Sequence, residues 1–170
     1  VVVVRSPWDY AERRDEFLAW ARLADAASVL LNPYPVLEAN THKGYLRDLQ
    51  ASGVPVVPTQ WYAPGDAATL VALDDRVVVK PAVSAGPRDT IRHHAEQSLA
   101  AAHAHTRARL DAGRTVMVQP YLEAVDTIGE TAVLFLGGEF SHAIRKGPLL
   151  QRDIEGERVD TGRPGVNGED

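Results

Sequence analysis

The hydrophobic pattern at the start of the chain predicts an α/β arrangement. Val1 to Val4 and Ser28 to Leu31 are rich in β-branched and aliphatic residues and predict short strands, the first with the pattern of a buried strand. Between them, apolar residues recur at helical spacing from Ala11 to Ala24. The residues that share one face of this helix are Phe17, Ala21 and Ala24. Strand, helix and strand in this order are typical of the closing βαβ unit of an α/β sheet.

Prolines separate this unit from a second predicted helix. Asn32 to Pro35 is predicted to be a loop, because its two prolines leave no regular ladder of hydrogen bonds. Asn40 or Thr41 then provides an N-cap for a helix that runs to Ala51 and ends before a glycine and a proline.

Short strands around one long helix follow, and they predict an α+β unit. The strands are expected over Val56 to Thr59, Arg76 to Lys80 and Thr115 to Gln119. A helix is expected over Ile91 to Ala112, with Gly113 just beyond its end. The residues expected on its buried face are Ala95, Leu99, Ala102, Thr106 and Leu110.

The last regular feature is a predicted β-hairpin. Thr131 to Leu136 and Glu139 to Arg145 are strand candidates, and Gly137-Gly138 between them is a strong hairpin signal. The segment from Gln151 to Asp170 is rich in charge and glycine and shows no periodicity, so it is expected to be a loop or a disordered tail.

Composition narrows the possible functions. The 170 residues are 45% apolar and 24% charged, which is ordinary for a globular protein, and the formal net charge of -5 argues against a nucleic-acid-binding protein. The absence of cysteine excludes disulfides and thiolate zinc sites, and it fits a reducing compartment. Since no apolar run is long enough to span a bilayer, we expect no membrane association and a cytoplasmic location.

A lysine at the end of a predicted strand is the most informative local feature. Three valines precede Lys80, and Pro81 ends the strand because proline cannot donate to a ladder. The small residues of the following loop, Ser84-Ala85-Gly86, let backbone N–H groups approach an anion closely. An ammonium group beside such a loop predicts a phosphate site, although a solvated lysine at a strand exit is the simpler alternative.

Two further segments fit a nucleotide site. Gln119-Pro120-Tyr121-Leu122 is a second strand exit, and the backbone groups freed by its proline are suited to an adenine edge between apolar walls, although ordinary core packing is the alternative. Lys43 lies in the first turn of the predicted second helix, where a cation opposes the helix dipole and requires either solvent or an anionic partner.

The end of the hairpin carries candidate charges. Arg145 and Lys146 are adjacent, so they point to opposite faces of a strand, and we favour Arg145 as the residue that meets a ligand because a guanidinium group suits carboxylate and phosphate oxygens. Glu130 precedes the hairpin and is a candidate for a ribose, substrate or lysine contact, with a surface position as the alternative.

Four histidines fall within the predicted long helix, namely His93, His94, His103 and His105. None of the pairs has the i, i+3 or i, i+4 spacing that metal ligation on a helix requires, so we expect them to be solvated and predict neither a zinc site nor a catalytic histidine.

Taken together, Lys43, Lys80 and the two strand exits resemble the ATP-grasp superfamily. The segments VVVKPAVSAGPRDT, MVQPYL and GETAVLFLGGEFSHAIRKGPLL, with RSPWDY near the start, are similar to its glutathione-synthetase-like branch, especially the O-ureido-serine cyclo-ligases of cycloserine biosynthesis. The resemblance implies an ADP-forming ligase in which the carboxylate of a small molecule attacks ATP and an amine-type group captures the acyl phosphate.

The resemblance also implies residue roles. Lys43 and Lys80 would hold phosphates of ATP, and the loop of Ser84, Ala85 and Gly86 would cover them. The main chain of Gln119, Pro120, Tyr121 and Leu122 would bind adenine, and Glu123 would bind the ribose. Arg145 would neutralise charge at the phosphate or carboxylate, and the turn from Ser6 to Tyr10 would line the acceptor-substrate side.

The implied organisation is that of an incomplete ATP-grasp protein with the end of a preceding α/β domain. Residues 1–54 would be that end with a linking helix, residues 55–122 the small lid subdomain, residues 123–150 the start of the large subdomain, and residues 151–170 a tail. The family binds two Mg²⁺ ions on later strands, whereas Asp153, Glu155, Glu157 and Asp160 fall in a predicted loop. We therefore expect a fragment without metal ligands, and a non-catalytic nucleotide-binding module remains the alternative.

Overall fold

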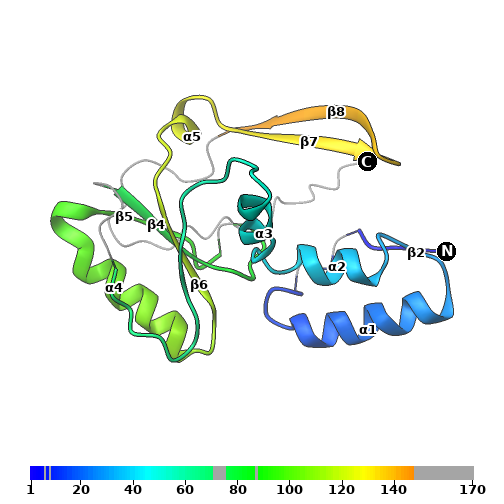
Figure 1. The fold of residues 1–170 in the computed structure, drawn as a ribbon, viewed down its shortest axis with the longest axis horizontal. Coiled ribbons are helices and arrows are strands. Elements are labelled where there is room, and N and C mark those ends of the chain that lie inside the picture. Colours follow the sequence, from blue (N-terminus) through cyan, green and yellow to red (C-terminus); the bar gives the residue numbers. More distant parts are fainter. Residues whose placement is uncertain (6, 8, 71–75, 87, 148–170) are drawn as a thin grey trace, which may run out of the picture.

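The computed structural model describes residues 1–5, 7, 9–70, 76–86 and 88–147, with only the backbone described for residues 94–98 (Figure 1). At the N-terminal end, β1 (Val2–Val3) and β2 (Leu30–Leu31) pair in parallel and are joined by α1 (Arg14–Ala27). The order of strand, helix and strand is confirmed, but both strands are shorter than predicted. Because only two strands pair here, Val1 and Val3 remain 84% and 58% exposed, and the prediction of a buried strand is wrong.

The helix α1 starts and ends three residues later than predicted and keeps the predicted face. Ala21 is fully buried and Leu18 nearly so, while Phe17 and Ala24 are partly buried. This face follows from the helical repeat, since residues three and four apart lie on the same side.

The predicted loop at Asn32 to Pro35 is only half correct. The helix α2 (Tyr34–Asn40) begins directly after Pro33. Pro35 lies in its first turn, where no intrahelical N–H donor is required, so proline is tolerated there. At this position proline favours the start of a helix and does not break it.

The next helix, α3 (Tyr45–Ala51), begins later than predicted. Asn40 is the last residue of α2 and Thr41 is its C-cap, so neither residue caps α3. Lys43 therefore lies in the turn before α3, and not in the first turn of a helix.

A four-stranded antiparallel sheet forms the second unit, in the order β3, β6, β4, β5. Its strands are β3 (Gln60–Tyr62), β6 (Val116–Pro120), β4 (Arg76–Pro81) and β5 (Ile91–His94). The expected strand over Val56 to Thr59 is wrong, since pairing with β6 begins at Gln60. The ends of β4 and β6 at prolines confirm both predicted strand exits.

The helix α4 (Ala95–Asp111) packs against this sheet (Figure 1). The core between them contains Tyr62, Leu70, Val77, Val79, Ala102, Leu110, Val116 and Val118. Thr106 and Ala102 are fully buried as predicted, whereas Leu99 is 41% exposed and does not belong to the core. The helix is also shorter than predicted, because Ile91 to His94 pair with β4 as a strand.

That strand brings two histidines together. His93 lies on β5 and is buried, and its Nε2 atom is 3.4 Å from Nδ1 of His105 on α4. The prediction of solvated histidines is therefore wrong for this pair, because a strand and a helix facing each other bring residues together that no single-helix spacing relates. His103 is partly buried, and the side chain of His94 lies outside the described residues.

This pair is expected to make stability depend on pH. Burial, then the neighbouring charges of His93 and Arg109, lower the pKa of His105 to about 4, against a raising effect of Asp89. The unfolded chain takes up this proton near pH 6.5 and the folded chain only near 4, so the stabilisation is complete above pH 6.5 and is lost as the pH falls towards 4. With a discount for partial exposure we expect a loss of about 1–2 kcal/mol.

Urea denaturation of wild type and His105→Gln at pH 7 and pH 4.5 checks this expectation. The variant is expected to lose less free energy of unfolding between the two pH values. The exposed His142 provides the matched control, since His142→Gln should retain the full dependence. Equal losses in wild type and His105→Gln would contradict the assignment.

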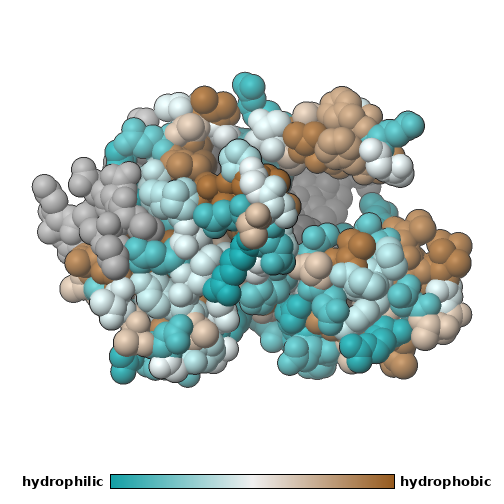
Figure 2. All heavy atoms as spheres, viewed as in Figure 1, coloured by the Kyte–Doolittle hydropathy of each residue, from teal (hydrophilic) through white to brown (hydrophobic). Residues whose placement is uncertain are grey.

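The predicted hairpin is confirmed. The strands β7 (Glu130–Leu136) and β8 (Glu139–Lys146) are antiparallel, and Gly137 and Gly138 have φ values of 61° and 86°, which only glycine adopts at little cost. The short helix α5 (Ala124–Thr127) precedes it. Figure 2 shows apolar side chains gathered over the hairpin. In the described part of the chain, no helix is long and apolar enough to cross a membrane.

Candidate functional site

The alternation of side chains along β4 separates a core face from a site face. Val77, Val79 and Pro81 are buried, and the first two belong to the core beneath α4. Val78 and Lys80 occupy the alternate positions, so they point to the opposite face of the sheet. The two-residue alternation of the strand therefore buries Val79 and Pro81 and directs Lys80 away from the core.

The Lys80 ammonium group lies in a partly desolvated position. Burial lowers its pKa, while the carboxylate of Glu130 at the start of β7 raises it. Within the described residues, no hydrogen-bond acceptor is found for its Nζ atom. The Lys80 side chain is therefore partly buried and not fully solvated, and its role as a phosphate ligand stays a prediction.

Lys43 lies beside Lys80 although the two are far apart in sequence. The backbone N–H of Lys43 donates to the carbonyl of Ala82 at 3.0 Å, which fixes the turn before α3 against the loop after β4. Burial, followed by the charge of Lys80, lowers the pKa of Lys43 to about 8. The fold thus holds two like charges close enough for the charge of Lys80 to affect the pKa of Lys43.

The loop that follows β4 contacts Lys43 directly. Lys43 Nζ donates to Ser84 Oγ at 2.6 Å and approaches the Ser84 carbonyl at 3.4 Å. Ala85 is partly buried, and Gly86 is exposed with φ of 67°. The structure therefore brings Lys43, Lys80 and Ser84 into one cluster, the arrangement expected from the sequence.

The second strand exit lies next to the first in the sheet. Val77 of β4 pairs with Pro120 of β6, and the Tyr121 N–H donates to the Arg76 carbonyl at 2.9 Å, so this amide is engaged within the protein. Gln119 is buried, and its side-chain amide donates to Thr59 Oγ1 at 2.7 Å. Leu122 is 48% exposed and offers an apolar surface beside the exit.

Charged residues fix this exit in a way that the sequence did not reveal. The Arg92 guanidinium contacts Asp126 of α5 at 3.2 Å, and both side chains are 11% exposed. Asp126 also accepts a hydrogen bond from the Tyr121 hydroxyl at 2.5 Å. Glu123, the expected ribose ligand, forms an ion pair with Arg76. These partners come from separate segments, so no local motif signals them.

Arg145 is exposed on β8, opposite Thr131 of β7. Lys146 lies 3.9 Å from the carboxylate of Glu130, the residue that also affects Lys80. The base of the hairpin therefore adds an acidic group to the lysine cluster, while Arg145 itself stays apart from the described contacts of Lys43 and Lys80.

The turn near the start of the chain borders an open cavity of about 310 Å³. The residues that line it are Asp9, Tyr10, Arg13, Glu16, Phe17 and Trp20. Ser6 and Trp8 of the predicted acceptor-side turn lie outside the described residues. Tyr10 links this cavity to the lysine cluster, because its hydroxyl donates to the Ser84 carbonyl at 3.2 Å.

Metal ligands are not gathered in the part of the chain that the structure describes. No group of three or more His, Asp or Glu side chains suited to a metal ion occurs there. Asp153, Glu155, Glu157 and Asp160 lie outside the described residues.

Structural comparison identifies the class to which this fold belongs. A crystal structure of D-cycloserine synthetase DcsG matches with a TM-score of 0.80 at 40% identity, covering 89% of this chain and 53% of that one. D-alanine-D-alanine ligase from Helicobacter pylori matches in fold with a TM-score of 0.54 at 13% identity, covering 82% and 44%. The fold is part of an ATP-grasp fold, which confirms the expected fold class.

Sequence comparison adds a similar protein and a matching family model. The chain is 43% identical over 162 residues to the cycloserine biosynthesis protein DcsG of Streptomyces lavendulae, covering 89% of this chain and 53% of that protein. Residues 1–32 match the family described as the N-terminal domain of D-cycloserine synthetase DcsG. The chain is thus similar to DcsG over most of its own length and spans about half the length of this relative.

Proposed function

We propose that the chain provides the ATP-binding part of an ADP-forming ligase that activates a carboxylate as an acyl phosphate. The observation that carries this proposal is the pairing of Lys43 and Lys80, two partly buried cations beside the Ser84 loop. Like charges in a desolvated position are costly unless an anion compensates them. The polyphosphate of a nucleotide is an anion that can compensate two such cations.

The proposed reaction proceeds in two steps. A carboxylate oxygen of the substrate attacks the γ-phosphorus of ATP, the bond from that phosphorus to the bridging oxygen breaks, and ADP leaves. An amine-type nucleophile then attacks the acyl carbon, loses its proton, and inorganic phosphate leaves with one of the original carboxylate oxygens. Lys43 and Lys80 would stabilise the charge on the phosphate oxygens, and the loop from Ser84 to Gly86 would exclude water.

The remaining contacts are assigned by position. The main chain around Gln119 to Leu122 would bind adenine. Glu123 would bind the ribose after its release from Arg76. Arg145 would bind a phosphate or a carboxylate when the substrate approaches. Mg²⁺ accompanies ATP in this class of ligase, and no group of three or more His, Asp or Glu side chains suited to a metal ion occurs among the described residues.

For the whole protein, we propose small-molecule substrates and an intramolecular reaction. The relative is named for cycloserine, a cyclic product, so the nucleophile and the activated carboxylate would belong to one molecule. We further propose residues 1–54 as the end of an α/β domain with a linking helix, residues 55–122 as the small subdomain and residues 123–150 as the start of the large one.

The products of the reaction test this mechanism. With the chain as part of its full-length protein and a substrate labelled with ¹⁸O in its carboxylate, we expect ADP and inorganic phosphate that carries one ¹⁸O atom. Phosphate-product mass spectrometry measures the label. Formation of AMP and pyrophosphate would exclude the acyl-phosphate route.

A non-catalytic nucleotide-binding module is the second candidate, favoured by the lack of a metal-ligand cluster among the described residues. It predicts that ATP binds to the full-length protein but that no ADP forms with any carboxylate and amine pair. The same assay therefore separates the two candidates.

A further inference from the structure

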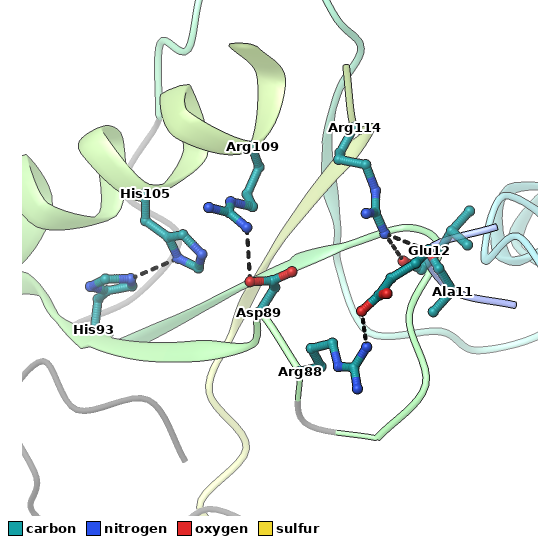
Figure 3. A network of polar contacts seen from close by, with 9 residues as sticks. Ala11, Glu12, Arg88, Asp89, His93, His105, Arg109 and Arg114 are labelled. Carbon is teal, nitrogen blue, oxygen red and sulfur yellow. Dashed lines mark hydrogen bonds and ion pairs between the residues drawn. The ribbon is translucent and has the colours of Figure 1, made fainter. Parts of the chain in front are cut away.

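The loop after β4 is attached to the N-terminal unit at three points, and none of the three was evident from the sequence. The first is Arg114, which lies between α4 and β6. One of its guanidinium nitrogens donates to the Ala11 carbonyl at 3.0 Å and to the Val83 carbonyl at 2.7 Å (Figure 3). A single side chain thus connects the start of the loop to the segment that precedes α1.

The second point is Tyr10, the neighbour of Ala11. Its hydroxyl donates to the carbonyl of Ser84 at 3.2 Å, and Ser84 is the residue whose hydroxyl receives the hydrogen bond from Lys43. Burial, and to a lesser degree the nearby Tyr45, raises the pKa of Tyr10, so its hydroxyl stays protonated and remains a donor over the ordinary pH range. Ser84 is therefore held between Tyr10 and Lys43.

The third point is an ion pair between Glu12 and Arg88 at the far side of the loop (Figure 3). Both side chains are more than half exposed, so the pair contributes little energy on its own. Its position is informative, because Tyr10, Ala11 and Glu12 are consecutive residues that contact the loop at Ser84, at Val83 through Arg114, and at Arg88.

We propose that Tyr10, Glu12 and Arg114 form a latch that positions the Val83–Ser84 segment over Lys43. The latch sets the affinity for the β- and γ-phosphates of a nucleotide. The reason is that the position of Ser84 relative to the Lys43 ammonium group decides how closely the loop and this group can approach the same phosphate oxygens. That the ligand is a nucleotide rests on the proposed function, whereas the effect of the latch on the position of the loop does not. The latch residues are positioning residues and need not touch the nucleotide.

Two measurements on Tyr10→Phe test the latch. Loss of one hydrogen bond is expected to speed amide hydrogen exchange of residues 83–86 about three- to tenfold and to raise the Kd for ATP by a similar factor. The Kd for AMP, which lacks the β- and γ-phosphates, is expected to stay unchanged. Glu12→Gln should shift exchange less than twofold, since its pair with Arg88 is exposed.

Tyr34→Phe is the matched control, because the Tyr34 hydroxyl has partners on Arg22 and Glu38 and none among the described residues of the loop. The latch is overturned if Tyr10→Phe leaves loop exchange at the level of Tyr34→Phe, or if ATP and AMP affinities fall together. Faster loop exchange in a chain whose wild type binds no ATP would support the latch and contradict the proposed function, so the two failures are distinguishable.

Discussion

Lys80→Met is expected to weaken ATP binding by about 30-fold, which corresponds to about 2 kcal/mol and lies within the range for a hydrogen bond to a charged group. The reason is the position of Lys80 at the end of β4, on the sheet face opposite the core and without an acceptor among the described residues. Methionine keeps the length and apolar stem of lysine and removes only the charge and the donors. Isothermal titration calorimetry at pH 7 and moderate salt measures the change.

The Lys80→Met variant is not expected to be less stable than the wild type. Burial disfavours the charged form of Lys80, and its charge also lowers the pKa of Lys43, so its removal should leave the free energy of unfolding unchanged or raise it. Arg107→Met is the control, since Arg107 is an exposed cation on α4 that pairs with Asp111 at 3.6 Å. Equal ATP affinity in the wild type and Lys80→Met would show that the lysine is merely a partly buried surface residue.

The local pattern of the sequence was sufficient to predict much of the sheet and the position of Lys80 at a strand exit, whereas its role as a phosphate ligand stays a prediction. Valine-rich segments that end at Pro81 and Pro120 define β4 and β6, because both the strand propensity and its termination lie in adjacent residues. The hairpin at Gly137-Gly138 follows from the same kind of local rule. The sequence predicts Lys43 in the first turn of a helix, whereas it lies in the turn before α3, and the fold brings it near Lys80 by pairing that turn with Ala82.

The errors arise where partners lie far apart in sequence. Ile91 to His94 has little apolar alternation, and only its pairing with β4 makes it a strand, so the helical pattern that follows was extended too far. The resulting assignment of His93 to a helix then hid its contact with His105. Arg114 contacts Ala11 across 103 positions, and no periodicity or motif predicts a bond of that range.

The strand exit at Tyr121 yields the prediction with the largest effect on stability. Asp126→Ala is expected to lower the free energy of unfolding by about 3 kcal/mol, because it leaves the largely buried Arg92 without its anion and the Tyr121 hydroxyl without its acceptor. For a chain of this length we expect the melting temperature to fall by roughly 6–12 °C. Urea denaturation followed by circular dichroism measures the loss.

Two comparisons decide whether the loss comes from an uncompensated charge or from packing. Asp111→Ala removes an exposed carboxylate paired with Arg107 and should change stability by less than about 0.5 kcal/mol. The double variant Arg92→Met, Asp126→Leu removes both charges and should recover much of the loss, since a buried pair replaced by apolar residues is often neutral in stability. If the double variant is as unstable as Asp126→Ala, the loss comes from the packing around Tyr121 or from its unpaired hydroxyl, and not from the uncompensated charge of Arg92. If it recovers, the Arg92–Asp126 pair fixes the geometry of the proposed adenine site at little net gain in stability, because Coulomb attraction then only offsets the desolvation of the two groups.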